Sequence, residues 1–315
     1  MESTQKPFKN VDSFLKIRFG PAGTHLFNRK TGVNVLLDEI IPPKTIWAAA
    51  PRQVSIALTN NCDLKCPHCY ASKTPGMIDY DDVTNWLSEL DLNGCIGVGF
   101  GGGEPTLYPK LIELCYYTSH KTELAVIMTT HAHNLTDRLL NKLKGNVHFI
   151  RVSMDGVGST YENIRNRPFD ILLERITKLS SITAFGINYL VNSKTIRDID
   201  TAIHISADLG VSEFLLIPEV PVGRGKGIDN ETTIELQNWV NHYRGPVRLA
   251  VSEGSAEGFP TCNAFKNETG LNSFVHIDAH GIIKQTSYDT NGIDIRKDGV
   301  MAALNRLKAI KGETV

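Results

Sequence analysis

Short apolar runs alternate with longer amphipathic ones from Arg52 to Glu219, and this alternation is the strongest constraint on the fold. The short runs predict strands over 53–59, 95–100, 124–129, 149–154, 185–191 and 214–217. Helical periodicity lies between them, from 79 to 90 and over 110–119, 136–144, 169–180 and 199–209. Strands and helices that alternate in this way form a parallel sheet with right-handed crossovers. The sequence therefore predicts an α/β fold, a partial (β/α)6 barrel of TIM type, with its site at the carboxyl ends of the strands.

Two smaller regions flank this core. Residues 15–41 hold short apolar strands separated by glycine-containing turns, which predicts a short N-terminal β-hairpin or meander. After Glu219 come a basic glycine-rich loop over 221–227, a helix over 232–243, a hairpin over 274–284 and a helix over 300–310. We expect an N-terminal region over 1–50, the barrel over 51–222 and a small C-terminal α/β extension over 223–315.

Composition excludes several classes of protein. A chain of 315 residues with 41% hydrophobic residues can fill a large core, which excludes a disordered chain or a small disulfide scaffold. Thirty-three Lys and Arg against 34 Asp and Glu give a net charge of −1, so no nucleic-acid partner is expected. The first residues lack an apolar signal segment, and no apolar run approaches the roughly 18 residues of a membrane span. We expect a soluble, cytoplasmic protein with no membrane partner.

Three of the 6 cysteines are clustered directly after the first barrel strand, as Cys62, Cys66 and Cys69. A compact loop can turn three such thiolates onto one 4Fe–4S cluster, for which cysteine is the usual ligand. Three ligands for four irons leave one iron open to bind a small chelating molecule. A zinc site with His68 as the fourth ligand is the alternative, and a disulfide within the loop is disfavoured in a reducing compartment.

The spacing CxxxCxxC followed by the aromatic Tyr70 resembles the hallmark of the radical S-adenosylmethionine (radical SAM) superfamily, and the resemblance extends from Gln53 to Glu219. It implies that the open iron holds the amino and carboxylate groups of S-adenosylmethionine (SAM). One-electron reduction would then release a 5′-deoxyadenosyl radical that abstracts hydrogen from a substrate. The implied cofactors are one 4Fe–4S cluster and SAM, and the implied electron source is an external donor such as flavodoxin or ferredoxin.

The next strand ends in a segment that is similar to the GGEP motif of this superfamily, which contacts the SAM ammonium group. Gly102 and Gly103 would let the backbone approach the ligand, and Glu104 would offer an anion to the amine.

Later strand ends also resemble SAM-binding positions. Ser153 and Asp155 resemble polar contacts to the ribose and methionine parts, although they could equally end a strand and cap a helix. Arg165 matches an arginine near the SAM carboxylate. Asn192 resembles a ribose ligand, and residues 216–218 resemble an edge that packs on adenine. No residue is assigned a catalytic role.

The third strand departs from the superfamily pattern. Many members have Thr-Asn-Gly after it, whereas this chain reads Thr129-Thr130-His131-Ala132-His133. No further metal ligand is evident, so we expect His131 and His133 to contact substrate or to be solvated.

The C-terminal region resembles the start of a SPASM or twitch extension, in which a cysteine precedes a hairpin. Members with such extensions place another cysteine after the hairpin, where this chain reads Gln285-Thr286-Ser287-Tyr288. We therefore predict a shortened extension without an auxiliary cluster, in which Cys262 is a buried small residue or a thiol near the substrate. Cys95 and Cys115 are expected in the core.

The extension favours a ribosomally synthesised peptide (RiPP) substrate that is crosslinked, epimerised or otherwise rearranged. Radical chemistry on a small metabolite or nucleotide is the first alternative, and a zinc-stabilised, non-catalytic binding protein is the second. A leader peptide would bind the N-terminal hairpin by strand addition or a separate leader-binding protein. Arg224 and Lys226 would meet an acidic substrate segment or lie in solvent.

Overall fold

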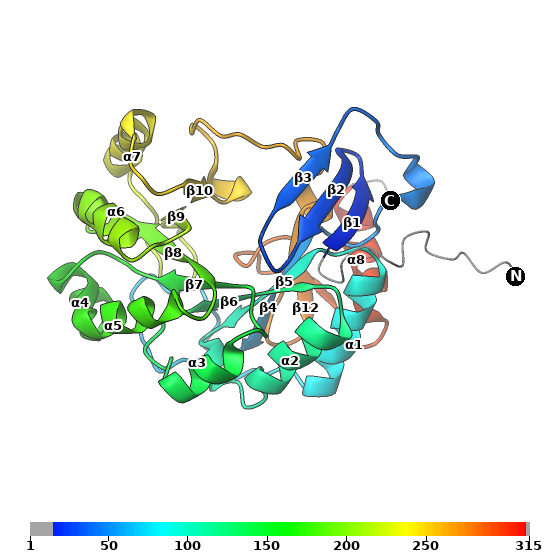
Figure 1. Cartoon of the computed structure of the whole chain (residues 1–315), viewed down its shortest axis with the longest axis horizontal. Coiled ribbons are helices and arrows are strands. Elements are labelled where there is room, and N and C mark those ends of the chain that lie inside the picture. The colour runs from blue at the N-terminus through cyan, green and yellow to red at the C-terminus, as the bar shows by residue number, and fades with distance from the viewer. Residues whose placement is uncertain (1–14, 313–315) are drawn as a thin grey trace, which may run out of the picture.

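The computed structural model describes residues 15–312, which form a three-stranded sheet beside a ten-stranded one (Figure 1). The small sheet is an antiparallel meander of β1 (Leu15–Gly20), β2 (Gly23–Asn28) and β3 (Asn34–Leu37). The large sheet has the order β10-β9-β8-β7-β6-β5-β4-β11-β12-β13, and its two end strands do not pair with each other. The barrel is therefore open.

Six parallel strands in chain order form the centre of the large sheet, as the sequence predicts. They are β4 (Gln53–Thr59), β5 (Gly97–Gly102), β6 (Ala125–Thr130), β7 (Phe149–Ser153), β8 (Ala184–Val191) and β9 (Glu213–Pro218). The helices on the outer side are α1 (Tyr80–Leu92), α2 (Leu111–Lys121), α3 (Asp137–Leu143), α4 (Ser159–Arg165), α5 (Phe169–Leu179) and α6 (Ile199–Asp208) (Figure 1). Short 3₁₀ turns occur at Lys44–Ile46, Pro105–Leu107, Ile196–Asp198, Glu253–Ser255 and Gly270–Asn272. The sequence missed α4, which is only 7 residues long.

The two faces of the parallel sheet are filled differently. In β7, Ile150 and Val152 are buried in the core shared with the helices, whereas Arg151 and Ser153, on the opposite face, are only half-buried. β5 repeats the alternation, with Val98 and Phe100 in the core. Side chains alternate in this way because successive residues of a strand point to opposite faces. In these two strands the inner face is thus less completely buried than the face that packs on the helices.

The N-terminal meander is joined to the barrel by buried ion pairs. Arg18 of β1 pairs with Glu268, and each side chain is only 3% exposed. Lys16 pairs with Asp91 of α1, and Arg18 Nη1 also donates to Gly94 O at 2.7 Å. These contacts hold the small sheet against the region where α1 ends.

The C-terminal extension adds strands to both edges of the parallel sheet. β10 (Leu249–Val251) pairs parallel with β9, and β11 (Phe274–Ile277) pairs parallel with β4. The predicted hairpin is confirmed, since β12 (Ile282–Lys284) pairs antiparallel with β11, and β13 (Ile293–Asp294) follows. The predicted helices are α7 (Asn230–His242) and α8 (Gly299–Lys311), and Glu89 of α1 accepts bonds from the first turn of α8.

The three isolated cysteines differ in burial. Cys95 and Cys115 are fully buried, as predicted. Cys262 is exposed, so its predicted burial is wrong. The segment around it contains no long apolar run that would pull the thiol into a core.

No helix among residues 15–312 has the length and apolar character needed to cross a membrane.

The free energy of unfolding should fall as the pH is lowered from 6.5 to 4. Burial lowers the pKa of His133, His148 and His276 to about 4, whereas a histidine in an unfolded chain titrates near 6.5. Between these values the unfolded chain binds more protons, so each histidine removes about 1.4 kcal/mol of stability per pH unit. Urea unfolding at pH 7, 6 and 5 measures this slope, and His276→Asn should reduce it. A stability that is flat over this range would contradict the prediction.

Candidate functional site at the carboxyl ends of the strands

The loop between β4 and α1 carries the three clustered cysteines. Cys66 is buried, Cys62 and Cys69 are half-buried, and none forms a disulfide. Burial raises the pKa of the Cys62 and Cys66 thiols, and Lys73 Nζ donates to Cys69 Sγ at 3.0 Å. Three free thiols on one loop are a donor set for iron–sulfur clusters or zinc. Nε2 of His68 faces Asp155 Oδ2 at 3.3 Å and is thus engaged within the protein, so Nδ1 is the nitrogen that would be left to serve as a fourth zinc ligand.

The glycines at the end of β5 allow this strand to approach the start of the cysteine loop. Gly103 N donates to Thr59 O at 2.6 Å, and Glu104 N donates to Asn61 O at 2.8 Å. A Cβ on Gly102 would lie 2.3 Å from Thr59 O, and one on Gly103 would lie 2.2 Å from Asn61 O. Real side chains cannot occupy such positions, so the close approach here is between two segments of the protein's own backbone. A contact between these glycines and SAM stays a prediction.

Glu104 is buried at the junction of β5 and β6. One carboxylate oxygen accepts from Thr106 N, Thr106 Oγ1 and Thr130 Oγ1, and the other accepts from His131 N at 3.0 Å. A buried carboxylate needs such donors because desolvation of its charge is costly. The carboxylate therefore joins two strand ends, and its predicted contact with the SAM amine stays a prediction.

A buried ion cluster joins the cysteine loop to the end of β7 and to α4. Asp155 Oδ2 lies 2.5 Å from Arg165 Nε and 3.3 Å from His68 Nε2. Burial opposes the negative charge, yet Arg165 and His68 hold the pKa of Asp155 well below its usual range. His68 Nδ1 is buried and has no hydrogen-bond partner among residues 15–312. This unsatisfied atom fits a site that receives a further polar group.

The structure also places the other two predicted SAM contacts at strand ends. Ser153 is the last residue of β7 and is half-buried on the inner face. Asn192 follows β8, and its side chain is engaged by the protein: Nδ2 donates to Glu219 Oε2 at 2.7 Å, and Oδ1 accepts from Lys194 N at 2.9 Å. Glu219 Oε1 accepts from Lys226 N at 2.7 Å. Asn192 thus positions the basic loop after β9.

This basic loop and the C-terminal extension both contact the cysteine loop. Arg224 N donates to Cys69 O at 3.0 Å, which places residues 221–227 against the last cysteine. The ring of Tyr70 makes an edge contact with Tyr288, with ring centroids 5.0 Å apart. Tyr288 lies in the segment after the hairpin, where proteins with a SPASM or twitch extension have a further cysteine. An aromatic pair therefore covers this side of the loop.

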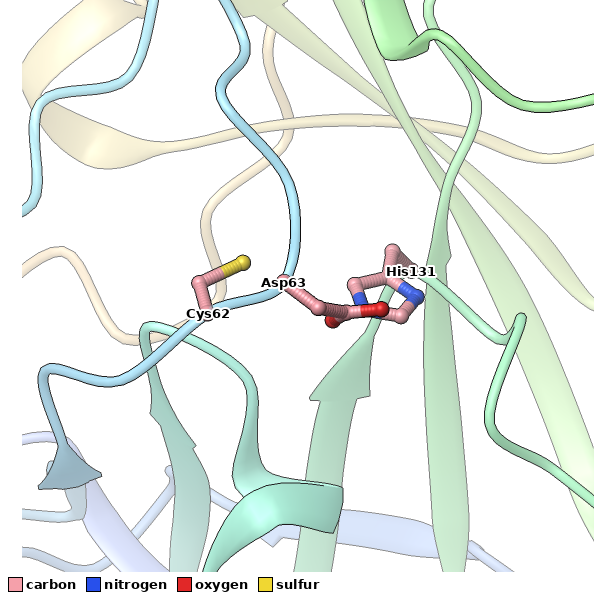
Figure 2. A group of neighbouring side chains, drawn as sticks. All are labelled: Cys62, Asp63 and His131. Carbon is pink, nitrogen blue, oxygen red and sulfur yellow. The ribbon is translucent and has the colours of Figure 1, made fainter.

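Sequence reasoning missed Asp63 and left two roles open for the histidines after β6, contact with substrate or exposure to solvent. Cys62, Asp63 and His131 offer three ligand atoms within 4.8 Å of one another (Figure 2). His131 is 3% exposed, so the expectation of a solvated side chain is wrong for it. His133 is half-buried, and its Nε2 lies 2.8 Å from the hydroxyl of Tyr161. The signal was present in the motif itself, because Asp63 directly follows the first clustered cysteine.

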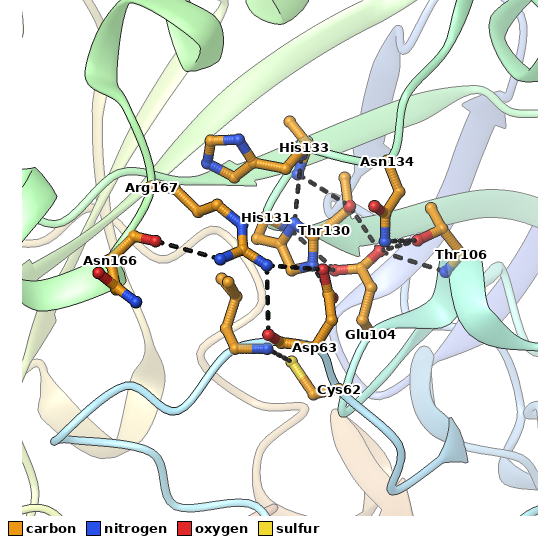
Figure 3. A network of polar contacts seen from close by, with 12 residues as sticks. Cys62, Asp63, Glu104, Thr106, Thr130, His131, His133, Asn134, Asn166 and Arg167 are labelled. Atoms are coloured by element: carbon orange, nitrogen blue, oxygen red, sulfur yellow. Dashed lines mark hydrogen bonds and ion pairs between the residues drawn. The ribbon is translucent and has the colours of Figure 1, made fainter.

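The cysteine loop and the ends of β5 and β6 meet in one polar network, which Arg167 after α4 also joins (Figure 3). A second cluster, of Asp155 with Arg165 and His68, ties the same loop to the end of β7. Three thiols beside buried ion pairs can hold a redox cluster, and the half-buried inner face next to them can receive a ligand.

Comparisons with known proteins agree with this geometry. Residues 56–204 match the model of the Radical SAM superfamily. The AdoMet-dependent heme synthase of Methanosarcina barkeri is 29% identical over 203 residues, covering 62% of this chain and 58% of that protein. Fe-coproporphyrin III synthase of the same organism is 30% identical, covering 55% and 45%. A probable GTP 3′,8-cyclase of Saccharolobus islandicus is also 30% identical, covering 54% and 58%. The chain thus spans 45% to 58% of the length of these curated relatives.

Solved structures of low sequence identity share the fold. SuiB of Streptococcus suis, bound to S-adenosylmethionine, superposes with a TM-score of 0.73 at 13% identity, covering 93% of this chain and 87% of that one. The anSMEcpe protein with bound AdoMet gives a TM-score of 0.63 at 16% identity, covering 81% and 77%. The likeness to SuiB includes nearly the whole chain and not only the barrel.

Proposed function

We propose that this chain is a radical SAM enzyme that uses a 4Fe–4S cluster and SAM to start radical chemistry on a substrate, because residues 56–204 match the model of the Radical SAM superfamily. The observation that carries the proposal is the placement of three free thiols on one loop after β4, next to the end of β5. Cys62, Cys66 and Cys69 would hold the cluster. When bound, the cluster and SAM together supply a hydrogen-abstracting 5′-deoxyadenosyl radical.

The protein's own residues hold this loop in place from several sides. Asp155 and Arg165 fix His68 between the second and third cysteines, and Arg224 N holds Cys69 O. Such outer contacts matter because they orient the ligands of a metal site. The candidates for contact with SAM remain those predicted from the sequence, Tyr70, Gly102, Gly103, Glu104, Ser153 and Asn192, with Arg165 near its carboxylate.

We further propose that the substrate is a peptide. β3 pairs with β2 along one edge, and no strand among residues 15–312 pairs with its other edge. Val35 and Leu37 on β3 are 41% and 53% exposed, so an extended peptide could add a strand here and cover apolar surface. The shared fold includes SuiB, which was also solved with its precursor peptide SuiA, and this supports a peptide partner.

A small-molecule substrate is the second candidate, and the curated relatives favour it. The proteins that are 29% to 30% identical to this chain are named AdoMet-dependent heme synthase, Fe-coproporphyrin III synthase and probable GTP 3′,8-cyclase. Those identities exceed that to SuiB, although they cover little more than half of this chain.

The function is tested by anaerobic reconstitution with iron and sulfide. We expect a brown protein that produces 5′-deoxyadenosine from SAM when dithionite stands in for flavodoxin or ferredoxin. A colourless protein with stoichiometric zinc would overturn the proposal. Mass spectrometry of a co-expressed candidate precursor peptide then tests the substrate. An unmodified peptide, together with turnover of a tetrapyrrole or nucleotide, would favour the small-molecule alternative.

A further inference from the structure

We propose that His131 is a positioning residue that fixes the cysteine loop through Asp63, so that Cys62 is held in place to bind the cluster. The inference rests on the proposed function, because it assigns a role toward the same cluster. It accounts for the one strand end at which this chain departs from the Thr-Asn-Gly pattern of its superfamily.

The contact itself joins two segments that are far apart in the sequence. His131 Nε2 lies 2.8 Å from Asp63 Oδ1, while Arg167 Nη2 binds Asp63 Oδ2 at 3.2 Å (Figures 2 and 3). Asp63 directly follows Cys62, and Leu64 N donates to Cys62 Sγ at 3.4 Å. Because both carboxylate oxygens are held, the backbone that carries Cys62 has little freedom to rotate its thiol away.

The imidazole of His131 is fixed on its other side as well. Its Nδ1 accepts from His133 N at 3.2 Å, so Nε2 carries the proton. Nε2 faces two carboxylates, Asp63 Oδ1 at 2.8 Å and Glu104 Oε2 at 3.3 Å, and the shorter contact makes Asp63 its hydrogen-bond acceptor. The backbone N of His131 donates to Glu104 Oε2. Ala132 has a φ of 68°, which an alanine adopts only at a cost, and this tight turn lets His133 N reach the ring.

A metal ion bound by Cys62, Asp63 and His131 is the competing interpretation of the same atoms. It requires Nε2 of His131 to lose the proton that it donates to Asp63. It also requires Cys62 to leave the set of three cysteines. The hydrogen-bonded arrangement therefore favours a positioning role, and His131 serves the cluster as an outer partner.

Two amide substitutions distinguish the contribution of Nε2 of His131 from that of Nδ1. In His131→Gln the amide nitrogen can take the place of Nε2 and still donate to Asp63. In His131→Asn the shorter amide matches only Nδ1 and cannot reach Asp63. We expect His131→Asn and His131→Ala to lose iron to a chelator about 10-fold faster than the parent, at the low end of the 10- to 100-fold typical of outer-shell partners. His131→Gln should stay within about 2-fold of the parent, since it keeps the donor.

Asp63→Ala and the double variant His131→Ala/Asp63→Ala complete a double-mutant cycle, in which the rate of iron loss is compared among the four proteins. If both residues act through their mutual contact, the double variant should lose iron no faster than the worse single variant. The midpoint potential of the cluster, followed by its visible absorption, provides a second readout, and it should shift in His131→Asn but not in His131→Gln. His133→Gln, which leaves the backbone bond to His131 intact, is the matched control and should retain iron.

Equal iron loss from the Gln and Asn variants, or additive effects in the double variant, would overturn the inference while the parent still binds its cluster. A parent protein that binds no cluster would instead overturn the proposed function. Zinc bound stoichiometrically by the parent and lost in His131→Gln would support the competing metal site and contradict the positioning role.

Discussion

Replacing Cys66 with alanine is expected to abolish iron–sulfur binding and the production of 5′-deoxyadenosine. The thiol is buried in the cysteine loop, and a methyl group offers no ligand in its place. Because even outer partners of metal ligands contribute about 10- to 100-fold to affinity, loss of a ligand should lower cluster affinity by at least about 100-fold. Iron and sulfide content and the visible absorption after anaerobic reconstitution measure the first effect, and a SAM cleavage assay measures the second.

Cys262→Ala is the matched control for this experiment, because Cys262 is exposed and lies outside the cysteine loop. This variant should keep its iron and its SAM cleavage activity. If Cys66→Ala retained a stoichiometric cluster, the assignment of the three clustered cysteines would be wrong. If Cys262→Ala lost the cluster, a second site in the extension would have to be considered.

The barrel could be predicted from the sequence because its signals are local. The strands from β4 to β9 overlap short apolar runs, and α1, α2, α5 and α6, with 10 to 13 residues each, are long enough to show their periodicity. Cys62, Cys66 and Cys69 form a motif of fixed spacing, so their common role needed no three-dimensional information. The places of β10 and β11 in the large sheet could not be predicted, since both pair with strands that no local pattern identifies as neighbours.

The candidate site was harder to predict, because its side chains are held by distant partners. The sequence predicts a close approach of Gly102 and Gly103 to a ligand, whereas the close approach in the structure is to Thr59 and Asn61. Glu104 was expected to face a ligand, and two of its four donors, Thr130 Oγ1 and His131 N, come from the end of β6. Periodicity and motif spacing indicate which residues are buried and which have side chains suited to binding a metal or a ligand. They do not report which residue of another strand end provides the partner.

Replacing Arg165 with methionine should destabilise the fold strongly at neutral pH. Arg165 and Asp155 are almost fully buried, and removal of the guanidinium leaves a buried carboxylate with only the His68 ring beside it. Breaking a buried ion pair in this way typically costs about 3–5 kcal/mol. Urea unfolding of Arg165→Met against the parent at pH 7 measures the loss. Arg167→Met is the matched control two residues away, since the Arg167–Asp63 pair is about one-third exposed and should contribute no more than about 1 kcal/mol.

The difference in unfolding free energy between the parent and Arg165→Met should depend on pH, and this dependence tests whether the charge of Asp155 causes it. In the parent the depressed pKa of Asp155 gives stability that is present above the unfolded value of about 3.9 and is lost only as the pH falls through the folded value. In Arg165→Met, burial acts on Asp155 with less opposition, so its pKa rises and the folded variant takes up a proton at a higher pH than the parent. The stability difference between the two proteins should therefore shrink as the pH is lowered from 7 to 4. The contributions of His148 and His276 cancel in the difference, because Arg165 is not among the charges that shift the pKa of either histidine. His133 does not cancel fully, since Arg165 is one of the charges that lower its pKa. A difference that stayed constant with pH would mean that Arg165 stabilises the fold through packing rather than through the charge of Asp155.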